Sequence, residues 1–253
     1  MGQRCYTGHS CDSRVIHEPT VQLPDLTRAT LIRRYKRFLA DVELSTGEKV
    51  TVHCPNTGAM TGLAVPGSPV WLSYHDNPKR KLAWTWELVE TSEGMACIHS
   101  VRANAVTEEA LSAGEVPELA GFTLCRREVT YGTGSRADFC LDYAYGSAML
   151  EVKAVTLLVE QDRGLFPDAV SARALRHVHD LEAVVLEGGR AAMIFCSLHT
   201  AVRCFAPASH IDPQYAKALQ QAVAAGVEVY GLGVTVTDQV IKAVGRLMIE
   251  GIS

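Results

Sequence analysis

The amino-acid sequence predicts a two-domain protein of mixed α+β and α/β class, in which a small all-β barrel precedes a larger α/β domain. Its 253 residues are enough for one or two hydrophobic cores. Residues 27–100 hold short runs of β-branched and aromatic residues, punctuated by glycine and proline. From residue 101 onward, helix-like and strand-like segments alternate. The change of pattern predicts a domain boundary near residue 100.

The barrel region follows a segment, residues 1–26, that has no hydrophobic period and is expected to form a flexible tail. The run 30–42 predicts one strand and Val50–His53 a second, joined in a hairpin by a turn at Ser45–Glu48. Further short strands are expected at Val70–His75, Thr85–Glu90 and Ala96–Ser100. About five short strands in one small domain favour an OB-like barrel over residues 27–100.

The second region, residues 101–253, has the alternation that is typical of an α/β or α+β domain. A helix is expected at Asn104–Ala113 and a longer one at Ala169–Leu186, whose apolar residues recur at helical spacing. A third helix begins at Asp212 and ends at Gly226, a residue that favours helix termination. Strands are expected at Leu124–Tyr131, Arg136–Leu141, Ala148–Ala154, Ala191–Leu198 and Val227–Val236.

The composition of the chain excludes several classes of protein. Hydrophobic residues make up 47% and charged residues 21%, and no apolar stretch is long enough to cross a membrane as a helix. The first ten residues lack the apolar run of a secretory leader, so a cytoplasmic location is expected. A formal net charge of −4 argues against nucleic-acid binding by bulk charge, so such binding must use local basic patches. The cysteines form no Cys-x-x-Cys pair, which argues against a zinc ribbon.

Two acidic residues and a lysine stand out in the second region. Glu151 and Lys153 are two apart on a predicted strand and share a face, and a hairpin would set Asp138 of the preceding strand beside Glu151. Two adjacent carboxylates suit a hard divalent cation such as Mg²⁺ (or Mn²⁺), with the Val152 carbonyl as a further ligand. Lys153 would orient a water or neutralise a phosphate. The sequence thus predicts a catalytic centre of Asp138, Glu151 and Lys153.

The alternative is an exposed glutamate–lysine pair on a solvated strand, because Glu-x-Lys is a common spacing. Apolar residues flank the pair, however, and burying these charges is costly unless they are paired or bind a metal. Glu128 on an earlier strand offers a third acid. Arg173 and His177 lie four apart on the following helix, where one face can hold a phosphate. Asp, a short gap and Glu-x-Lys on strands match the PD-(D/E)XK nuclease arrangement.

Basic and aromatic residues gather in the predicted barrel, a mixture with which OB folds bind single strands through phosphates and stacked bases. They are Arg33, Arg34, Tyr35, Lys36 and Arg37 in the first strand, with Lys79, Arg80 and Lys81 in a later loop. A solvated strand face would explain the first group equally well. The glycine-containing segment around Asn56 resembles a loop that holds an anion with backbone N–H groups.

Longer segments of the chain are also distinctive: Leu31–Val42, His53–Met60, Lys79–Lys81, Arg136 with Asp138–Phe139, Glu151–Lys153 with Val155–Leu157, and Phe166–Ala169. On these segments the chain resembles the bacterial sugar fermentation stimulation protein A family over residues 29–236. The resemblance implies an N-terminal OB-like domain joined to a PD-(D/E)XK nuclease-like domain, non-specific DNA binding and a role in regulating sugar use. His99–Asn104, at the domain junction, departs from the family's pattern.

Three functions are compatible with the sequence. The first is a DNA-binding protein of the sugar fermentation stimulation type that carries a nuclease-like metal centre. It would bind single- or double-stranded DNA without preference for a particular base sequence. The second is an active Mg²⁺-dependent nuclease that cleaves DNA or RNA. The third is a protein that binds a nucleotide or a sugar phosphate. The first is the leading prediction, since the family is better known for binding DNA than for cutting it.

Overall fold

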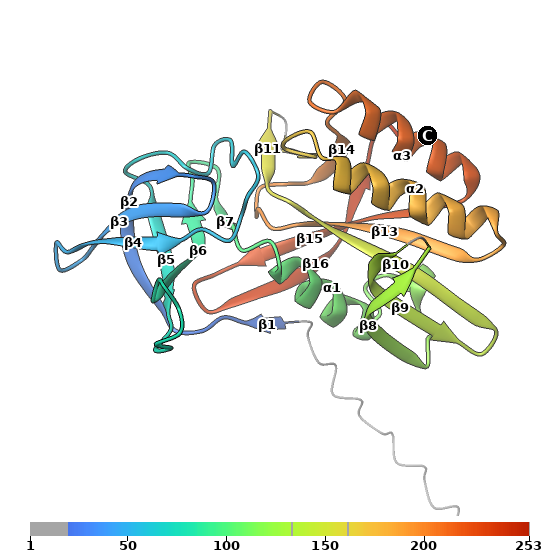
Figure 1. Ribbon diagram of the computed structural model, residues 1–253, viewed down its shortest axis with the longest axis horizontal. Coiled ribbons are helices and arrows are strands. Elements are labelled where there is room, and N and C mark those ends of the chain that lie inside the picture. Colours follow the sequence, from blue (N-terminus) through green and yellow to red (C-terminus); the bar gives the residue numbers. More distant parts are fainter. Residues whose placement is uncertain (1–19, 133, 161, 253) are drawn as a thin grey trace, which may run out of the picture.

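The computed structural model describes residues 20–132, 134–160 and 162–252. A small barrel is followed by a larger α/β domain, and Figure 1 shows the two lying side by side. Most of the predicted tail, residues 1–19, lies outside the described residues. Thr20–Gln22 was expected in that tail but forms β1, which pairs antiparallel with β16 (Val240–Ile249). Val21 packs into the core of the larger domain, which explains the pairing.

The barrel is built from five strands and extended by a sixth. They are β2 (Leu26–Tyr35), β3 (Leu39–Leu44), β4 (Lys49–His53), β5 (Pro69–Tyr74), β6 (Trp84–Glu90) and the short β7 (Met95–Cys97). Neighbours in the order β4-β3-β2-β5-β6-β7 are antiparallel, and a parallel contact between His53 and Thr85 closes the sheet on itself. Val42, Val52 and Trp86 point inward and are fully buried, as alternation in a small barrel requires.

The predicted single strand over 30–42 is wrong, because the chain reverses within it. Lys36 and Arg37 adopt left-handed backbone angles, with φ of 50° and 66°, and separate β2 from β3. The guanidinium of Arg34 stabilises this turn by donating a hydrogen bond to the Arg37 carbonyl at 2.8 Å. No glycine or proline marks the reversal in the sequence, so the run of β-branched and basic residues concealed it.

The larger domain is a mixed sheet in the order β11-β12-β14-β16-β15-β13-β10-β9-β8. The predicted strands appear as β8 (Leu124–Tyr131), β9 (Ser135–Tyr143), β10 (Gly146–Val155), β13 (Arg190–Ser197) and β15 (Glu228–Val236). Sequence patterns missed β16 and the short β11 (Leu157–Val159), β12 (Arg163–Phe166) and β14 (Cys204–Pro207). β16 is half exposed and contains Gly245, which blurs its hydrophobic pattern. A short 3-10 helix lies at Pro117–Leu119.

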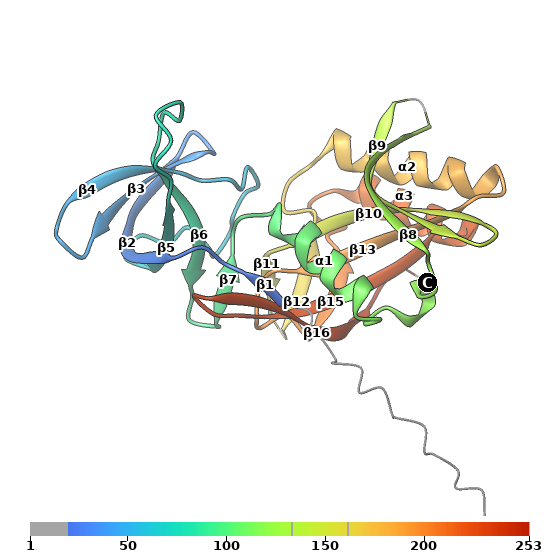
Figure 2. The ribbon, with the colours of Figure 1, turned by 90° about the horizontal axis from the view of Figure 1, so that it is seen from below.

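Helices cover both faces of this sheet. α1 (Arg102–Ser112) packs on one face, and α2 (Ala172–Leu186) and α3 (Pro213–Ala225) pack on the other, as Figures 1 and 2 show. α2 begins later than predicted, because the Ser171 hydroxyl caps it by accepting a hydrogen bond from Ala174 N at 3.1 Å. None of the helices in the described part of the chain is long and apolar enough to span a membrane.

A buried carboxylate joins the two domains. Glu87 of β6 is 1% exposed, yet it receives a hydrogen bond from the Ser73 hydroxyl at 2.8 Å and lies 2.8 Å from His99 Nδ1 and 3.2 Å from Arg102 Nη2. Burial alone would raise the pKa of Glu87, but His99, Arg102 and Ser73 outweigh it and hold that pKa at about 2. Because Arg102 opens α1, this group ties the barrel to the first helix of the larger domain.

The ionisation of Glu87 should make folding depend on acidity. Its pKa is lower in the folded protein than in the unfolded chain, so its contribution is complete above about pH 4.5 and is lost as the pH falls toward 2. We expect Glu87→Gln to lower the free energy of unfolding at pH 7 by on the order of 3 kcal/mol. Denaturant unfolding measured between pH 7 and pH 3 should show the difference shrinking in acid.

The matched control is Glu90→Gln, which changes an exposed glutamate at the end of the same strand. It should leave the free energy of unfolding within about 0.5 kcal/mol of the parent value. An equal loss from both variants, or a Glu87→Gln effect that does not change with pH, would contradict the role given to Glu87.

Candidate functional site

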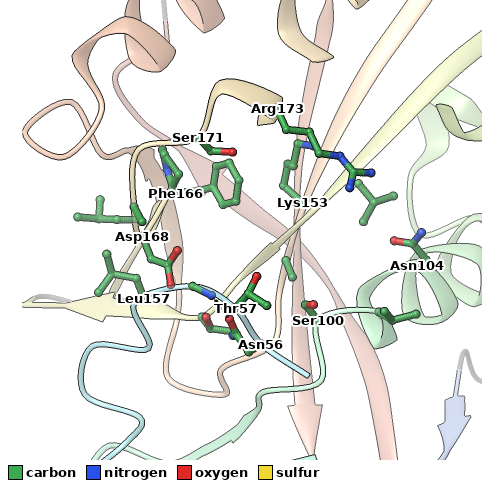
Figure 3. Close-up of a pocket in the computed structure, with 18 of the residues that line it drawn as sticks. Asn56, Thr57, Ser100, Asn104, Lys153, Leu157, Phe166, Asp168, Ser171 and Arg173 are labelled. Carbon is green, nitrogen blue, oxygen red and sulfur yellow. Dashed lines mark hydrogen bonds between the residues drawn. The ribbon is translucent and has the colours of Figure 1, made fainter. Parts of the chain in front are cut away.

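A cavity of about 520 Å³ lies where the barrel meets the α/β domain. The barrel contributes Arg37 and the loop Asn56–Gly58, the connecting segment contributes Ser100, and the remaining lining comes from the larger domain. Figure 3 shows Asn56 and Thr57 on one side of this cavity, with Lys153, Ser171 and Arg173 on the other. The cavity therefore has walls from both domains, and Asp138 and Lys153 of the predicted centre form part of its surface, while Glu151 lies behind that lining.

Asp138 and Glu151 lie at the point where two paired strands separate. The regular pairing of β9 with β10 ends at Phe139 opposite Leu150, one residue before both acids. Asp138 Oδ2 then accepts a hydrogen bond from Val152 N at 2.7 Å, and its Oδ1 accepts one from Asn104 Nδ2 at 2.8 Å. The structure thus brings Asp138, Glu151 and Val152 together, as their spacing predicted.

The Glu151 side chain packs toward α2, where it meets His177. It is 4% exposed, and its Oε1 accepts a hydrogen bond from Lys153 Nζ at 2.6 Å and contacts Nδ1 of His177. The second oxygen, Oε2, is buried and makes no hydrogen bond to any described residue. A buried carboxylate oxygen without a donor is unfavourable, so this atom is available to a cation.

The two carboxyl groups have opposite shifts in pKa. Burial and the charge of Glu151 raise the pKa of Asp138 above its ordinary value. Burial also acts to raise the pKa of Glu151, but the hydrogen bonds and positive charge of His177 and Lys153 prevail and lower it. The surroundings thus favour the ionised form of Glu151 and disfavour that of Asp138, a contrast that is common at functional sites.

His177 does not face the cavity, where it was expected to help hold a phosphate. It is 4% exposed and lies beneath Glu151, and its Nε2 accepts a weak hydrogen bond from Arg173 Nε at 3.5 Å. Its Nδ1 faces Oε1 of Glu151. His177 therefore positions Glu151, while the exposed Arg173 remains at the cavity.

Glu128, which was expected as a third acid, lies on β8, and Arg136, from one of the distinctive segments, lies on β9. Glu128 lines the cavity and has a φ of 54°, an uncommon angle for a residue with a side chain. Its exposed carboxylate is 3.7 Å from the guanidinium of Arg136, which is 65% exposed. Glu128 is therefore near Asp138, while Arg136 lies beyond the cavity lining.

The barrel residues that were predicted to bind nucleic acid fall into two groups, those at the cavity and those away from it. Only Arg37 among them lines the cavity, where its Nε donates a hydrogen bond to the Thr57 carbonyl at 2.8 Å. Arg34 braces the cavity wall, because its Nη2 donates to the carbonyls of Asn56 and Gly58, each at 2.9 Å. The remaining six lie outside the cavity lining: Arg33, Tyr35, Lys36, Lys79, Arg80 and Lys81.

Several of those six already have partners within the protein. Arg33 pairs with Asp41 at 2.8 Å and lies over the ring of Tyr35, whose hydroxyl donates to the same aspartate. Arg80 donates a hydrogen bond to the Thr85 hydroxyl at 2.8 Å. Their contact with nucleic acid remains a prediction from the sequence.

Sequence patterns missed two residues that shape the site. Asn104 was recognised only as part of a helix, although it holds the Asp138 carboxylate. Asp168 belongs to a distinctive segment but was given no role, and it accepts a hydrogen bond from Met60 N at 3.3 Å across the domain boundary. Both contacts join residues that are remote in sequence, so spacing alone could not find them.

The donor set suits a cation that keeps most of its water. In the part of the chain that the structure describes, no group of three or more histidine, cysteine, aspartate or glutamate side chains is placed to hold a metal. Asp138 and the unpartnered oxygen of Glu151 offer two carboxylates. Mg²⁺ is commonly bound through one or two carboxylates and several waters, so these residues fit such an ion.

Comparison with known proteins bears on these features. Residues 32–98 match the family described as the SfsA N-terminal OB domain, and residues 101–240 match the sugar fermentation stimulation protein RE domain. A sugar fermentation stimulation protein homolog from Pseudomonas paraeruginosa is 48% identical over 230 residues, covering 90% of this chain and 98% of that protein. A homolog from Chromohalobacter salexigens is 48% identical over 222 residues, covering 86% and 87%.

A solved structure is also similar over most of the chain. It is described as Pyrococcus furiosus SfsA in complex with Ca²⁺, and it has 26% sequence identity and a TM-score of 0.82, covering 91% of this chain and 98% of that one. The family resemblance predicted from the sequence is confirmed. So is the predicted fold class, an OB-like barrel followed by a nuclease-like α/β domain.

The pKa of Asp138 offers a direct check on the site's electrostatics. We expect Glu151→Gln to lower that pKa, because it removes a neighbouring negative charge, and Asn104→Ala to raise it, because it removes a donor to the carboxylate. Carboxyl ¹³C NMR titration of metal-free protein would measure both shifts. Asp142→Asn, on the same strand as Asp138 but outside the cavity lining, is the control and should leave the pKa nearly unchanged. Shifts of the opposite sign would contradict the arrangement.

Proposed function

Since the chain belongs to the sugar fermentation stimulation protein family, we propose that it binds DNA in the cavity between its domains and cleaves it at a divalent metal centre. The carrying observation is that Asp138 and Lys153 line a cavity together with Arg37 and Arg173 from different domains, while the buried Glu151 carboxylate contacts Lys153 from behind. Carboxylates recruit the cation, and basic residues recruit phosphate. The relative from Pyrococcus furiosus was solved with Ca²⁺, another cation that prefers oxygen ligands.

Asp138 and Glu151 would hold the cation, with the Val152 carbonyl as a further ligand. When bound, Mg²⁺ or Mn²⁺ supplies positive charge to phosphate oxygens and makes water more acidic. Lys153 would orient the attacking water, a role supported by the contact of its ammonium with Glu151 and by its position in the cavity lining. Water adds to phosphorus and gives one proton to solvent, one ester P–O bond breaks, and the leaving oxygen takes a proton from solvent, so that a phosphate monoester and a hydroxyl remain.

Arg37 and Arg173 would hold the phosphates on either side of the cut. Both are exposed and line the cavity, Arg37 from the barrel and Arg173 from the first turn of α2. A guanidinium binds phosphate with two parallel hydrogen bonds, which fixes the orientation of the ester as well as its position. Asn56 supports this arrangement, because its Oδ1 accepts a hydrogen bond from Gly58 N at 2.8 Å and shapes the loop.

The named relatives link the family with sugar fermentation. We propose that any such role acts through DNA in the cytoplasm, by binding, cleavage or both. Binding without cleavage is the alternative, and the same residues would then serve as a metal-assisted clamp on phosphate.

Cleavage should require both the metal and the acids. We expect purified protein to cut labelled oligonucleotides with Mg²⁺ or Mn²⁺ and to stop when chelator is added. Asp138→Ala, Glu151→Ala and Lys153→Ala should each lower the rate by on the order of 100-fold or more. Rates measured on denaturing gels, with single- and double-stranded DNA and RNA as substrates, would test this.

Asp142→Asn is the matched control, because Asp142 lies on the same strand as Asp138 but outside the cavity lining and pairs with Arg126. It should cleave at the parent rate. Cleavage that survives Asp138→Ala would place the chemistry elsewhere. Salt-sensitive DNA binding without cleavage would support the alternative in which the site only clamps phosphate. Failure to bind nucleic acid at low salt would favour a nucleotide or sugar phosphate ligand.

We expect Arg37 to contact one phosphate of DNA, and the salt dependence of the affinity measures the number of such contacts. The logarithm of the affinity for DNA falls with the logarithm of salt concentration by about 0.9 per neutralised phosphate, or about 0.7 on single strands. We expect Arg37→Ala to weaken binding of all sequences alike and to reduce that slope by about one contact. Fluorescence anisotropy across a salt series, with Lys49→Ala in the same barrel as the control, would measure it. An unchanged slope would remove Arg37 from the interface.

A further inference from the structure

The depth of the acidic centre bears on the form of nucleic acid that can reach it. Lys153 lines the cavity with its side chain only 11% exposed, and the Glu151 side chain that it contacts is 4% exposed, so the acidic centre is recessed. Duplex DNA is stiff over about 150 base pairs, and its phosphates follow the outside of a rod. A phosphate within continuous duplex cannot reach recessed groups unless its strand leaves the helix. A flexible single strand can bend into the cavity.

One wall of the cavity is fixed by contacts between the domains. Met60 N donates a hydrogen bond to Asp168 Oδ2 at 3.3 Å, and a side-chain carbon on Gly58 would lie only 2.1 Å from the same oxygen. The absence of a side chain at Gly58 therefore lets the barrel loop close on the other domain. Arg34 holds the loop from the barrel side through backbone carbonyls.

The mouth of the cavity carries exposed apolar side chains. Val101, just before α1, is 68% exposed, and Val170, just before α2, is 75% exposed; both line the cavity. Phe38 is 49% exposed and follows the cavity residue Arg37 in the turn between β2 and β3, although it lies outside the cavity lining. Apolar and aromatic surface beside a cation suits unstacked bases, because a base face binds the apolar group while its phosphate binds the cation. Paired bases in a duplex do not offer their faces.

We propose that this site accepts single-stranded nucleic acid, including frayed ends and unpaired segments, and excludes the paired interior of a duplex. The inference rests on the proposed function and names its substrate. A cavity of about 520 Å³ falls in the range of about 300–1,000 Å³ that holds a ligand of drug or nucleotide size. The major groove of B-form DNA alone is about 12 Å wide, so a duplex cannot be enclosed.

The test compares three forms of one DNA sequence with the full-length protein. They are the single strand, a duplex sealed by hairpins at both ends, and the same sealed duplex with a central unpaired bubble. Binding is measured by fluorescence anisotropy with Ca²⁺, and cleavage on denaturing gels with Mn²⁺. We expect the single strand and the bubble to bind at least about tenfold more tightly than the sealed duplex, with cleavage confined to unpaired nucleotides.

Equal binding and cleavage of the sealed duplex would overturn this inference and leave the proposed function standing. Absence of binding and cleavage with all three forms would instead sink the proposed function, and this inference with it. RNA of the same sequence, tested in parallel, should follow the single strand, because an unpaired chain of either sugar can enter the cavity.

Variants of the mouth separate base contact from general folding. Val101→Ala combined with Val170→Ala should weaken single-strand binding several-fold and leave the weak binding of the sealed duplex unchanged. Val65→Ala removes a valine of the barrel that is 53% exposed and does not line the cavity, and it should have no effect. Because these valines are exposed, the thermal unfolding midpoint should not move. An equal loss for single strand and duplex would overturn base contact at the mouth.

Discussion

The burial of Glu151 is the constraint on which the rest of the site depends. Removing a carboxylate from water is unfavourable by several kcal/mol unless charged or hydrogen-bonding groups meet it. His177 and Lys153 meet one of its oxygens, which fixes α2 against β10 and leaves the other oxygen without a protein donor. Arg173, one turn before His177, is then carried to the cavity.

The barrel completes the cavity by contacts that are mostly made with backbone atoms. Arg34 binds carbonyls of the Asn56–Gly58 loop, and Asp168 meets that loop from the other domain. Glu87 and a strand contact between Ala96 and His199 hold the two domains together near the same boundary. These contacts between the domains therefore set the distance between Arg37 of the barrel and the acidic centre.

The sequence was sufficient to predict most elements and the residues of the acidic centre, because both follow from short-range periodicity. Alternation on β10 placed Glu151 and Lys153 on one face, and hairpin geometry placed Asp138 beside them. The turn at Lys36–Arg37 was missed because it lacks glycine and proline. The burial of His177 was missed because it depends on how α2 packs on the sheet. Asn104 and Asp168 act through contacts between distant segments, which no spacing rule reports.

The close contact of Gly58 with Asp168 also constrains how the protein can change during evolution. Position 58 has no room for a side chain while a carboxylate of this length occupies position 168. A larger residue at 58 is compatible with the closed wall only if position 168 becomes smaller in the same lineage. The two positions should therefore vary together among related proteins, although one belongs to the barrel and the other to the α/β domain. Such covariation would be inherited as a property of the boundary between the domains and would be invisible in either domain alone.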